Sequence, residues 1–113
     1  MANFHNIKIY NNDKLIKEYK NVKTITNENT YFYIDNIKTI ISKEKLIREN
    51  KEFKFELDFS KKNATYLLKK QNILYDIKVI EAEIIYKDND IKISYLIESN
   101  DEKIKIYIKN NNK

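Results

Sequence analysis

The sequence contains no cysteine, no glycine, no proline and no tryptophan, and its only histidine is His5. Without cysteine, the chain cannot form disulfides, thiolate metal sites or a cysteine nucleophile. Without glycine, it lacks the loops that cradle phosphates and dinucleotides. A single histidine disfavours histidine-based catalysis and rules out a multi-histidine metal site. These absences remove the residues of most catalytic sites, so we expect no enzymatic activity, no cofactor and no metal.

Three residue types dominate the composition. Of 113 residues, 20 are Ile, 21 are Lys and 16 are Asn. All three are encoded by AT-rich codons, so the bias reflects genome composition more than selection at a site. The hydrophobic share of 42% is enough for a core despite the 35% of charged residues. We expect one folded domain that spans residues 1–113.

The charge is basic but dispersed. The 22 Lys and Arg residues exceed the 17 Asp and Glu residues, giving a formal net charge of +5. Such an excess can attract nucleic acid or an anionic membrane surface. Here most lysines have an Asp, Glu or Asn close by in sequence, which is typical of a solvated surface. No apolar run approaches the ~20 residues of a membrane span. The first residues lack a signal-peptide pattern, so we expect a cytoplasmic protein with no membrane span.

Apolar and polar residues alternate along much of the chain. Residues 53–59 alternate without a break, and residues 91–97 and 104–109 repeat the pattern of a strand with one dry face. Further strands are predicted at residues 7–9, 14–19, 22–26, 31–35, 37–42, 46–49 and 64–70. Clusters of Asn and Asp separate them, and these residues tolerate positive φ best after glycine. We therefore predict an all-β fold, an antiparallel up-and-down barrel of roughly eight to ten strands.

Two segments depart from regular alternation. From residue 73 to 79 the regularly spaced apolar residues are the odd-numbered ones, and from residue 80 to 86 they are the even-numbered ones. A strand cannot change faces in this way without a bulge or bend, so we predict one close to Val79-Ile80. Residues 42–50 contain good helix formers, and a short helix there is the alternative to two short strands joined near residues 43–45. We favour the strands because Glu44 would fall on the buried side of such a helix.

From about residue 30 to residue 109, the order of elements resembles the YwiB-like family of small uncharacterised bacterial proteins. The resemblance rests on hydrophobic alternation in these pieces: Tyr31-Phe32-Tyr33-Ile34, Lys45-Leu46-Ile47-Arg48-Glu49-Asn50, Phe53-Lys54-Phe55-Glu56, and residues 73–86, 91–97 and 104–108. It implies a calycin-like (lipocalin-type) β-barrel. Where the family has Gly shortly after its Arg, this chain has Glu49-Asn50. The family has no settled activity, so the resemblance implies a fold more than a function.

The best candidates for a binding site are Arg48 and three tyrosines. Tyr66, Tyr75 and Tyr95 follow the dry phase of their strands. The interior of a barrel of about eight strands is either just filled by side chains or holds one small ligand. Inward tyrosines and Arg48 would line such a pocket, with the arginine recognising a carboxylate or phosphate. Our hypothesis is a non-enzymatic monomer or homodimer that binds a small apolar or amphipathic ligand; the alternative for these residues is a filled core.

A second function class is a basic barrel that binds single-stranded nucleic acid. Exposed aromatic residues along a basic surface can stack on bases, and the candidates are Tyr10, Tyr86 and Tyr107 among Lys8, Lys87, Lys105 and Lys109. Other polar groups suggest no chemistry. Glu81 and Glu83 lie in the phase assigned to solvent, and Asp88-Asn89-Asp90 is interpreted as a hairpin turn. We interpret His5 as a surface or edge residue.

Overall fold

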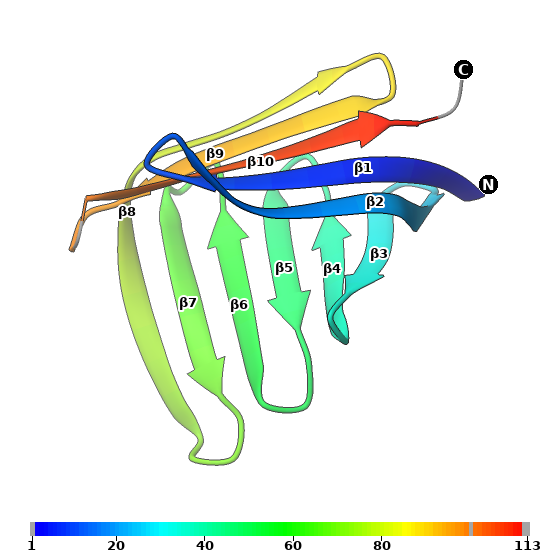
Figure 1. The fold of residues 1–113 in the computed structure, drawn as a ribbon. Coiled ribbons are helices and arrows are strands. Elements are labelled where there is room, and N and C mark those ends of the chain that lie inside the picture. The colour runs from blue at the N-terminus through cyan, green and yellow to red at the C-terminus, as the bar shows by residue number, and fades with distance from the viewer. Residues whose placement is uncertain (1, 100, 112–113) are drawn as a thin grey trace.

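The computed structural model describes residues 2–99 and 101–111, which form ten antiparallel strands closed into a barrel (Figure 1). Each strand pairs with its neighbours in the chain, and β1 pairs with β10. This confirms the predicted all-β up-and-down barrel. No helix occurs in the described ranges, and residues 42–50 contain a turn and β5, as favoured. The strands are β1 (Ala2–Asn11), β2 (Lys14–Thr26), β3 (Thr30–Ile34), β4 (Ile37–Ile41), β5 (Lys45–Glu49), β6 (Phe53–Asp58), β7 (Asn63–Leu68), β8 (Ile73–Lys87), β9 (Asp90–Ile97) and β10 (Glu102–Asn110).

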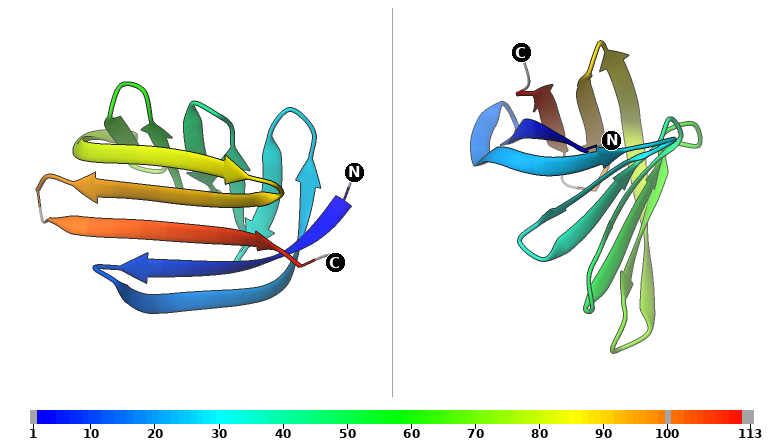
Figure 2. Two further views of the ribbon diagram at one scale, coloured as in Figure 1. Left: turned by 90° about the horizontal axis from the view of Figure 1, so that it is seen from above. Right: turned by 90° about the vertical axis from the view of Figure 1, so that its right-hand side faces the viewer.

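The long strand β8 divides the barrel into two sheets. Its first half, residues 73–78, pairs with β7, and its second half, from Val79 to Lys87, pairs with β9. The register shifts between Val79 and Glu81, which confirms the predicted bulge. The lower sheet therefore consists of β3 to β7 and the first half of β8. The upper sheet consists of β2, β1, β10, β9 and the second half of β8, and its strands run across those of the lower sheet (Figure 2).

On the other side of the barrel, where β2 and β3 join the two sheets, the strand pairing is short. Strands β2 and β3 pair only through Ile25 with Tyr31 and Thr26 with Thr30. The prediction of two strands at residues 14–19 and 22–26 was wrong, because β2 is continuous. The register with β1 shifts along this stretch, and Asn21 has a φ of 56° there. Its backbone N–H donates to Asn6 Oδ1 at 3.1 Å. The polar residues near Asn21, which suggested the end of a strand, therefore form a bulge within β2.

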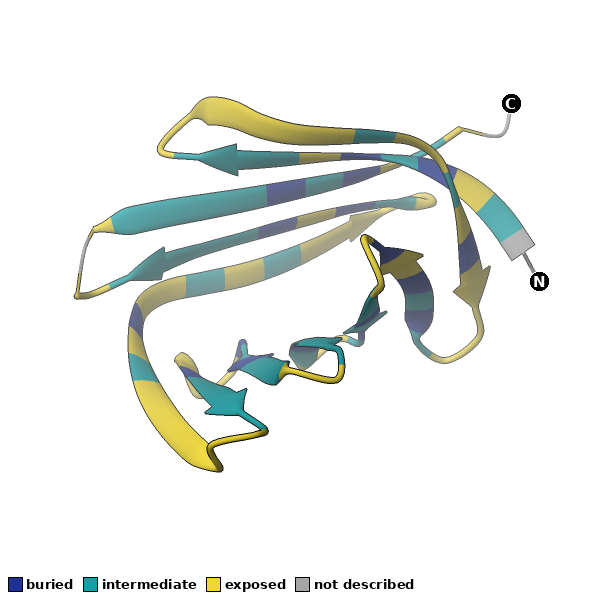
Figure 3. Cartoon of the chain, turned by 60° about the horizontal axis from the view of Figure 1, so that its bottom comes forward, coloured by how far each residue is buried: buried dark blue, intermediate teal, exposed yellow. Residues whose placement is uncertain are grey.

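The core lies where the two sheets face one another, and it thins toward one end. Ile7 and Ile93 from the upper sheet and Ile41, Leu46 and Leu57 from the lower sheet are all buried. In the first half of β8, by contrast, most side chains are exposed (Figure 3). Burial on the inner side of the lower sheet therefore decreases from β3 toward β8.

Asparagine and aspartate supply the conformations that glycine supplies elsewhere. Among the described residues nine have positive φ, and eight of these are Asn or Asp. The β3–β4 turn is one example, with φ values of 52° at Asp35 and 63° at Asn36. Short polar side chains lower the energy of the left-handed backbone conformation because they form local hydrogen bonds with the backbone. The predicted role of Asn and Asp in the turns is confirmed at Asn12, Asp13 and Asp88.

Replacing Asn36 should separate conformational preference from side-chain chemistry. We expect Asn36→Ala to lower the free energy of unfolding by about 1 kcal/mol, because alanine pays the full cost of the left-handed region. Asn36→Gly should keep or slightly raise stability. Urea unfolding of both variants and the parent chain measures this. Equal stability of the two variants would contradict the role assigned to the turn.

Candidate functional site

Six side chains form a row across the inner side of the lower sheet. Directly opposite pairs on successive strands join Phe32, Thr39, Arg48, Phe55, Tyr66 and Tyr75. Paired residues on antiparallel strands point to the same face. Phe32 and Thr39 are buried, which identifies this face as the inner one. Arg48 and two of the three predicted tyrosines therefore share one wall of the barrel, and we call these six residues the inner row.

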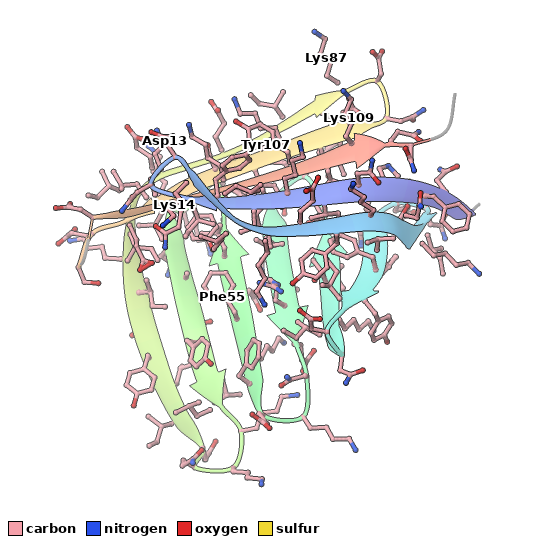
Figure 4. All side chains as sticks on the ribbon, in the orientation of Figure 1. Asp13, Lys14, Phe55, Lys87, Tyr107 and Lys109 are labelled. Atoms are coloured by element: carbon pink, nitrogen blue, oxygen red, sulfur yellow. The ribbon has the colours of Figure 1, made fainter. Side chains whose placement is uncertain are left out.

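Tyr95 approaches the inner row from the upper sheet. It lies on β9, and its ring centroid is 6.0 Å from that of Phe55, which Figure 4 labels on the lower sheet. Burial raises the pKa of the Tyr95 hydroxyl to about 12; the positive charge of Arg48 acts in the opposite direction and Glu102 in the same one. The structure thus gathers Arg48, Tyr66 and Tyr95 around Phe55. Tyr75, at the end of the row, is 49% exposed.

Arg48 has no partner among the residues that the structure describes. Its side chain is partly buried, and it forms neither a hydrogen bond nor an ion pair with them. The nearby acid Asp35 is already engaged, because the Tyr19 hydroxyl donates to its Oδ2 at 2.7 Å. This bond lowers the pKa of Asp35, with smaller contributions from Lys17 and Arg48. The guanidinium therefore keeps its five N–H donors for another group.

Thr39 is a second polar group without a partner. It lies directly opposite Arg48, is only 2% exposed, and its Oγ1 has no hydrogen-bond partner among the described residues. Both residues line an interior cavity of about 10 Å³, together with Ile7, Phe32 and Ile93. This space suits about one water molecule. The closed part of the barrel is therefore a filled core, as in the alternative interpretation, and any organic ligand must bind elsewhere.

Beyond Arg48, the inner side of the lower sheet is apolar and only partly covered. Five residues make up this open apolar face: Phe53, Tyr66, Leu68, Ile73 and Tyr75. The rings of Phe53 and Tyr66 stack with centroids 5.4 Å apart and an interplanar angle of 9°. Binding sites commonly combine an apolar lining with a few oriented polar groups. Here the polar groups are Arg48 and the Tyr95 hydroxyl.

The outer side of the upper sheet carries most of the residues of the nucleic-acid hypothesis. Tyr10, Tyr107, Lys8, Lys105 and Lys109 alternate outward on β1 and β10, and Lys87 does so on β8. Figure 4 shows Lys87 and Lys109 projecting away from the lower sheet. Tyr86 is different, because it pairs with the buried Ile91 and lies on the inner face. The structure therefore brings together all but one of these candidates.

The two outer faces differ in charge. On β1, β8, β9 and β10 of the upper sheet, Lys8, Lys87, Lys92, Lys103, Lys105 and Lys109 face outward with Glu81, Glu83 and Asp90. On the lower sheet, four outward lysines (38, 45, 54 and 78) match four outward acids (49, 56, 58 and 76). The dispersed lysines of the sequence are thus unevenly distributed in the fold. Sequence reasoning missed Lys92, whose ammonium lies 5.5 Å from the Tyr107 ring centroid.

The prediction that His5 lies at the surface was wrong. His5 is 3% exposed, because it shares the inward phase of Ile7 on β1. Its Nδ1 lies 2.7 Å from Thr24 Oγ1, and its Nε2 lies 3.2 Å from the backbone carbonyl oxygen of Asn89. These contacts connect β1 to β2 and to the β8–β9 turn. His5 is therefore a satisfied structural residue.

Within residues 2–99 and 101–111, no group of three or more His, Asp or Glu side chains is placed to hold a metal ion. In the same ranges no helix is long and apolar enough to cross a membrane.

The raised pKa of Tyr95 predicts a specific loss of stability in alkali. Folding favours the neutral phenol, so this contribution is present below the unfolded pKa of about 10 and is lost as pH rises toward the folded pKa of about 12. We expect the melting temperature to fall less steeply across this window in Tyr95→Phe than in the parent chain. Tyr33→Phe, at an exposed position, is the control. Identical pH profiles for Tyr95→Phe and the parent would contradict the burial of this hydroxyl.

Comparison of the chain with protein-family models, curated proteins and solved structures finds no match. The resemblance to the YwiB-like family therefore stays a prediction. Function has to be inferred from the residues and their geometry.

Proposed function

We propose that the chain is a non-enzymatic binding protein for a small amphipathic ligand with an acidic head group. The observation that carries this proposal is the unpartnered guanidinium of Arg48 on the inner wall, between Thr39 and Phe55. A partly buried cation that forms no ion pair or hydrogen bond is unfavourable. A carboxylate or phosphate from a ligand would supply that charge and accept paired N–H bonds.

Tyr95 supports the same head group. A phenol with a pKa of about 12 stays protonated at neutral pH and can donate a hydrogen bond. Its ring lies against Phe55, whose neighbour in the inner row is Arg48. Arg48 and Tyr95 would then hold one anionic group from two sheets, the arginine from below and the tyrosine from above.

The apolar body of the ligand would lie on the open apolar face. The cavity in the closed part of the barrel has a volume of about 10 Å³ and admits no such body. The stacked rings of Phe53 and Tyr66 and the half-exposed Tyr75 offer a flat apolar surface instead. We therefore favour a carboxylic acid with an aromatic or short acyl body, bound at the wide end of the barrel. Membership of the YwiB-like, calycin-like barrels is part of this proposal, and the up-and-down strand order supports it. A cytoplasmic location is a further part of the proposal.

The test compares a fluorescent carboxylic acid with its methyl ester. We expect the parent chain to bind the acid about tenfold more tightly or better, because a charge-assisted hydrogen bond contributes about 1.5–3 kcal/mol. Arg48→Met should abolish the preference while retaining weak binding of both probes. Lys54→Met is the matched control, because Lys54 lies on the outer side of the same sheet and should keep the preference.

Circular dichroism should show that both variants retain the strand signal. Equal affinity of the parent chain for acid and ester, or loss of the preference in Lys54→Met, would refute the assignment of Arg48.

The charge difference between the outer faces favours a second candidate function, the binding of single-stranded nucleic acid to the upper sheet. Tyr107 has its ring centroid 5.4 Å from that of Tyr10 and lies beneath the Lys92 ammonium. Lys92, Lys87, Lys109, Tyr107 and Ile85 also line one shallow surface pocket. Lysines would contact phosphates, and the tyrosine would stack on a base.

Salt dependence tests this second candidate. Binding of a labelled oligothymidine should weaken with salt, and replacing Lys92 and Lys109 together by Gln should reduce the slope of log affinity against log salt by about 0.7 per lost contact. Tyr107→Leu should weaken binding without changing that slope. The control replaces Lys38 and Lys54 on the balanced outer face and should change neither. Equal losses in the two lysine pairs would show that binding reflects net charge only and would refute this candidate.

A further inference from the structure

The first half of β8 is an exposed sheet edge. Residues 73–78 pair with β7 on one side, and their other side has no strand partner among the described residues (Figure 1). The backbone N–H of Glu98 donates to the carbonyl oxygen of Lys78 at 3.0 Å and ends the free stretch there. Between Ile73 and Ile77, the backbone donors and acceptors that point away from β7 therefore face solvent. Such an edge is a template for pairing with another strand.

The side chains on this edge are mostly apolar and do little to block pairing. Ile73, Leu74 and Tyr75 are consecutive, and all three are exposed, with Leu74 at 60%. They project to both faces of the sheet, since successive residues alternate. Only Asp76 carries a charge between residues 73 and 77. The stretch is thus an apolar edge strand of the kind that aggregates or associates unless it is covered.

Two other free edges, on β2 and on the second half of β8, carry charges. Strand β2 pairs with β3 only at Ile25 and Thr26, and the part of β2 before these residues carries Lys14, Lys17, Lys20 and Lys23. The second half of β8 carries Glu81 and Glu83 and starts at a bulge. Lysines, charges and bulges are the usual devices against edge pairing. Residues 73–77 have no lysine and no bulge, and Asp76 is their only charge, so this edge is open to pairing with a partner.

We infer that the partner is the same segment of a second copy of this chain, paired antiparallel about a two-fold axis at Tyr75. A register centred there uses the whole free stretch and places Ile73 opposite the partner's Ile77. A register shifted by two residues would centre on Asp76 and oppose two like charges. The odd-numbered residues lie on the inner face, so the two lower sheets join with both open apolar faces on one side. A two-fold axis gives closed, self-complementary pairing and no open fibre.

This dimer completes the end of the inner row. Tyr75, half exposed in one chain, would pack against the partner's Tyr75 across the axis. The open apolar face of each copy would then continue into that of the other. The inference depends on the free edge and its side chains, and it holds whether or not a ligand binds at Arg48.

Sedimentation velocity over a concentration series provides the first test. We expect the parent chain to approach twice its monomer mass of 13.7 kDa as concentration rises. Leu74→Lys, on the outer side of the edge, should shift the equilibrium to monomer, because a charge at the pairing edge opposes association. Ile16→Lys is the matched control: Ile16 is 51% exposed on β2, and its replacement should leave the dimer intact.

The absence of cysteine allows a second, independent test. A single Tyr75→Cys substitution should form an intermolecular disulfide on mild oxidation, because the two copies of this residue meet on the axis. Tyr33 lies on the outer face of the lower sheet, far along the sheet from β8, so Tyr33→Cys should form no intermolecular disulfide. A parent chain that stays monomeric at every concentration, a dimer that survives Leu74→Lys, a dimer lost in Ile16→Lys, or equal cross-linking of the two cysteine variants would each overturn the inference.

Discussion

The register shift between Val79 and Glu81 is the constraint on which the rest of the structure depends. It allows one strand to hydrogen-bond to β7 along its first half and to β9 along its second half, so that a single continuous chain of strands turns from one sheet into the other. A bulge is the physical means of such a turn, because an extra residue bends the strand and exchanges its faces. The buried face of β8 can therefore lie against the core on both sides of the bend.

The same bend explains why the barrel is filled at one end and open at the other. Between Lys78 and the start of β8, no described strand of the upper sheet continues alongside the lower sheet. Ile7, Ile41 and Leu57, near the crossing of the sheets, are fully buried. Tyr75 and Ile73 have the same inward phase but remain exposed. Phase determines which way a side chain points, and the facing sheet determines whether it is covered.

This distinction separates what could be predicted from the sequence and what could not. Period-two alternation and the change of phase at Val79-Ile80 predicted the strands, the barrel and its bend, since both depend on local geometry. The same alternation predicts that Arg48, Tyr66 and Tyr95 point inward. The exposure of Tyr75, the burial of His5 and the engagement of Asp35 by Tyr19 depend on strands distant in sequence. The continuity of β2 through Asn21 was hidden because an isolated polar residue marks a bulge and a turn equally well.

The position of Arg48 connects these points to function. One residue pair further into the barrel, Leu46 and Leu57 are completely enclosed, and a guanidinium there would lack both water and a counter-charge. One pair further out lie Asn50 and Phe53, where the wall is already open. Arg48 stands at the boundary, close enough to the core for its charge to influence Tyr95 and open enough to meet a solute. A charged head group can be recognised most strongly at such a boundary, because the local dielectric is reduced while the path from solvent stays open.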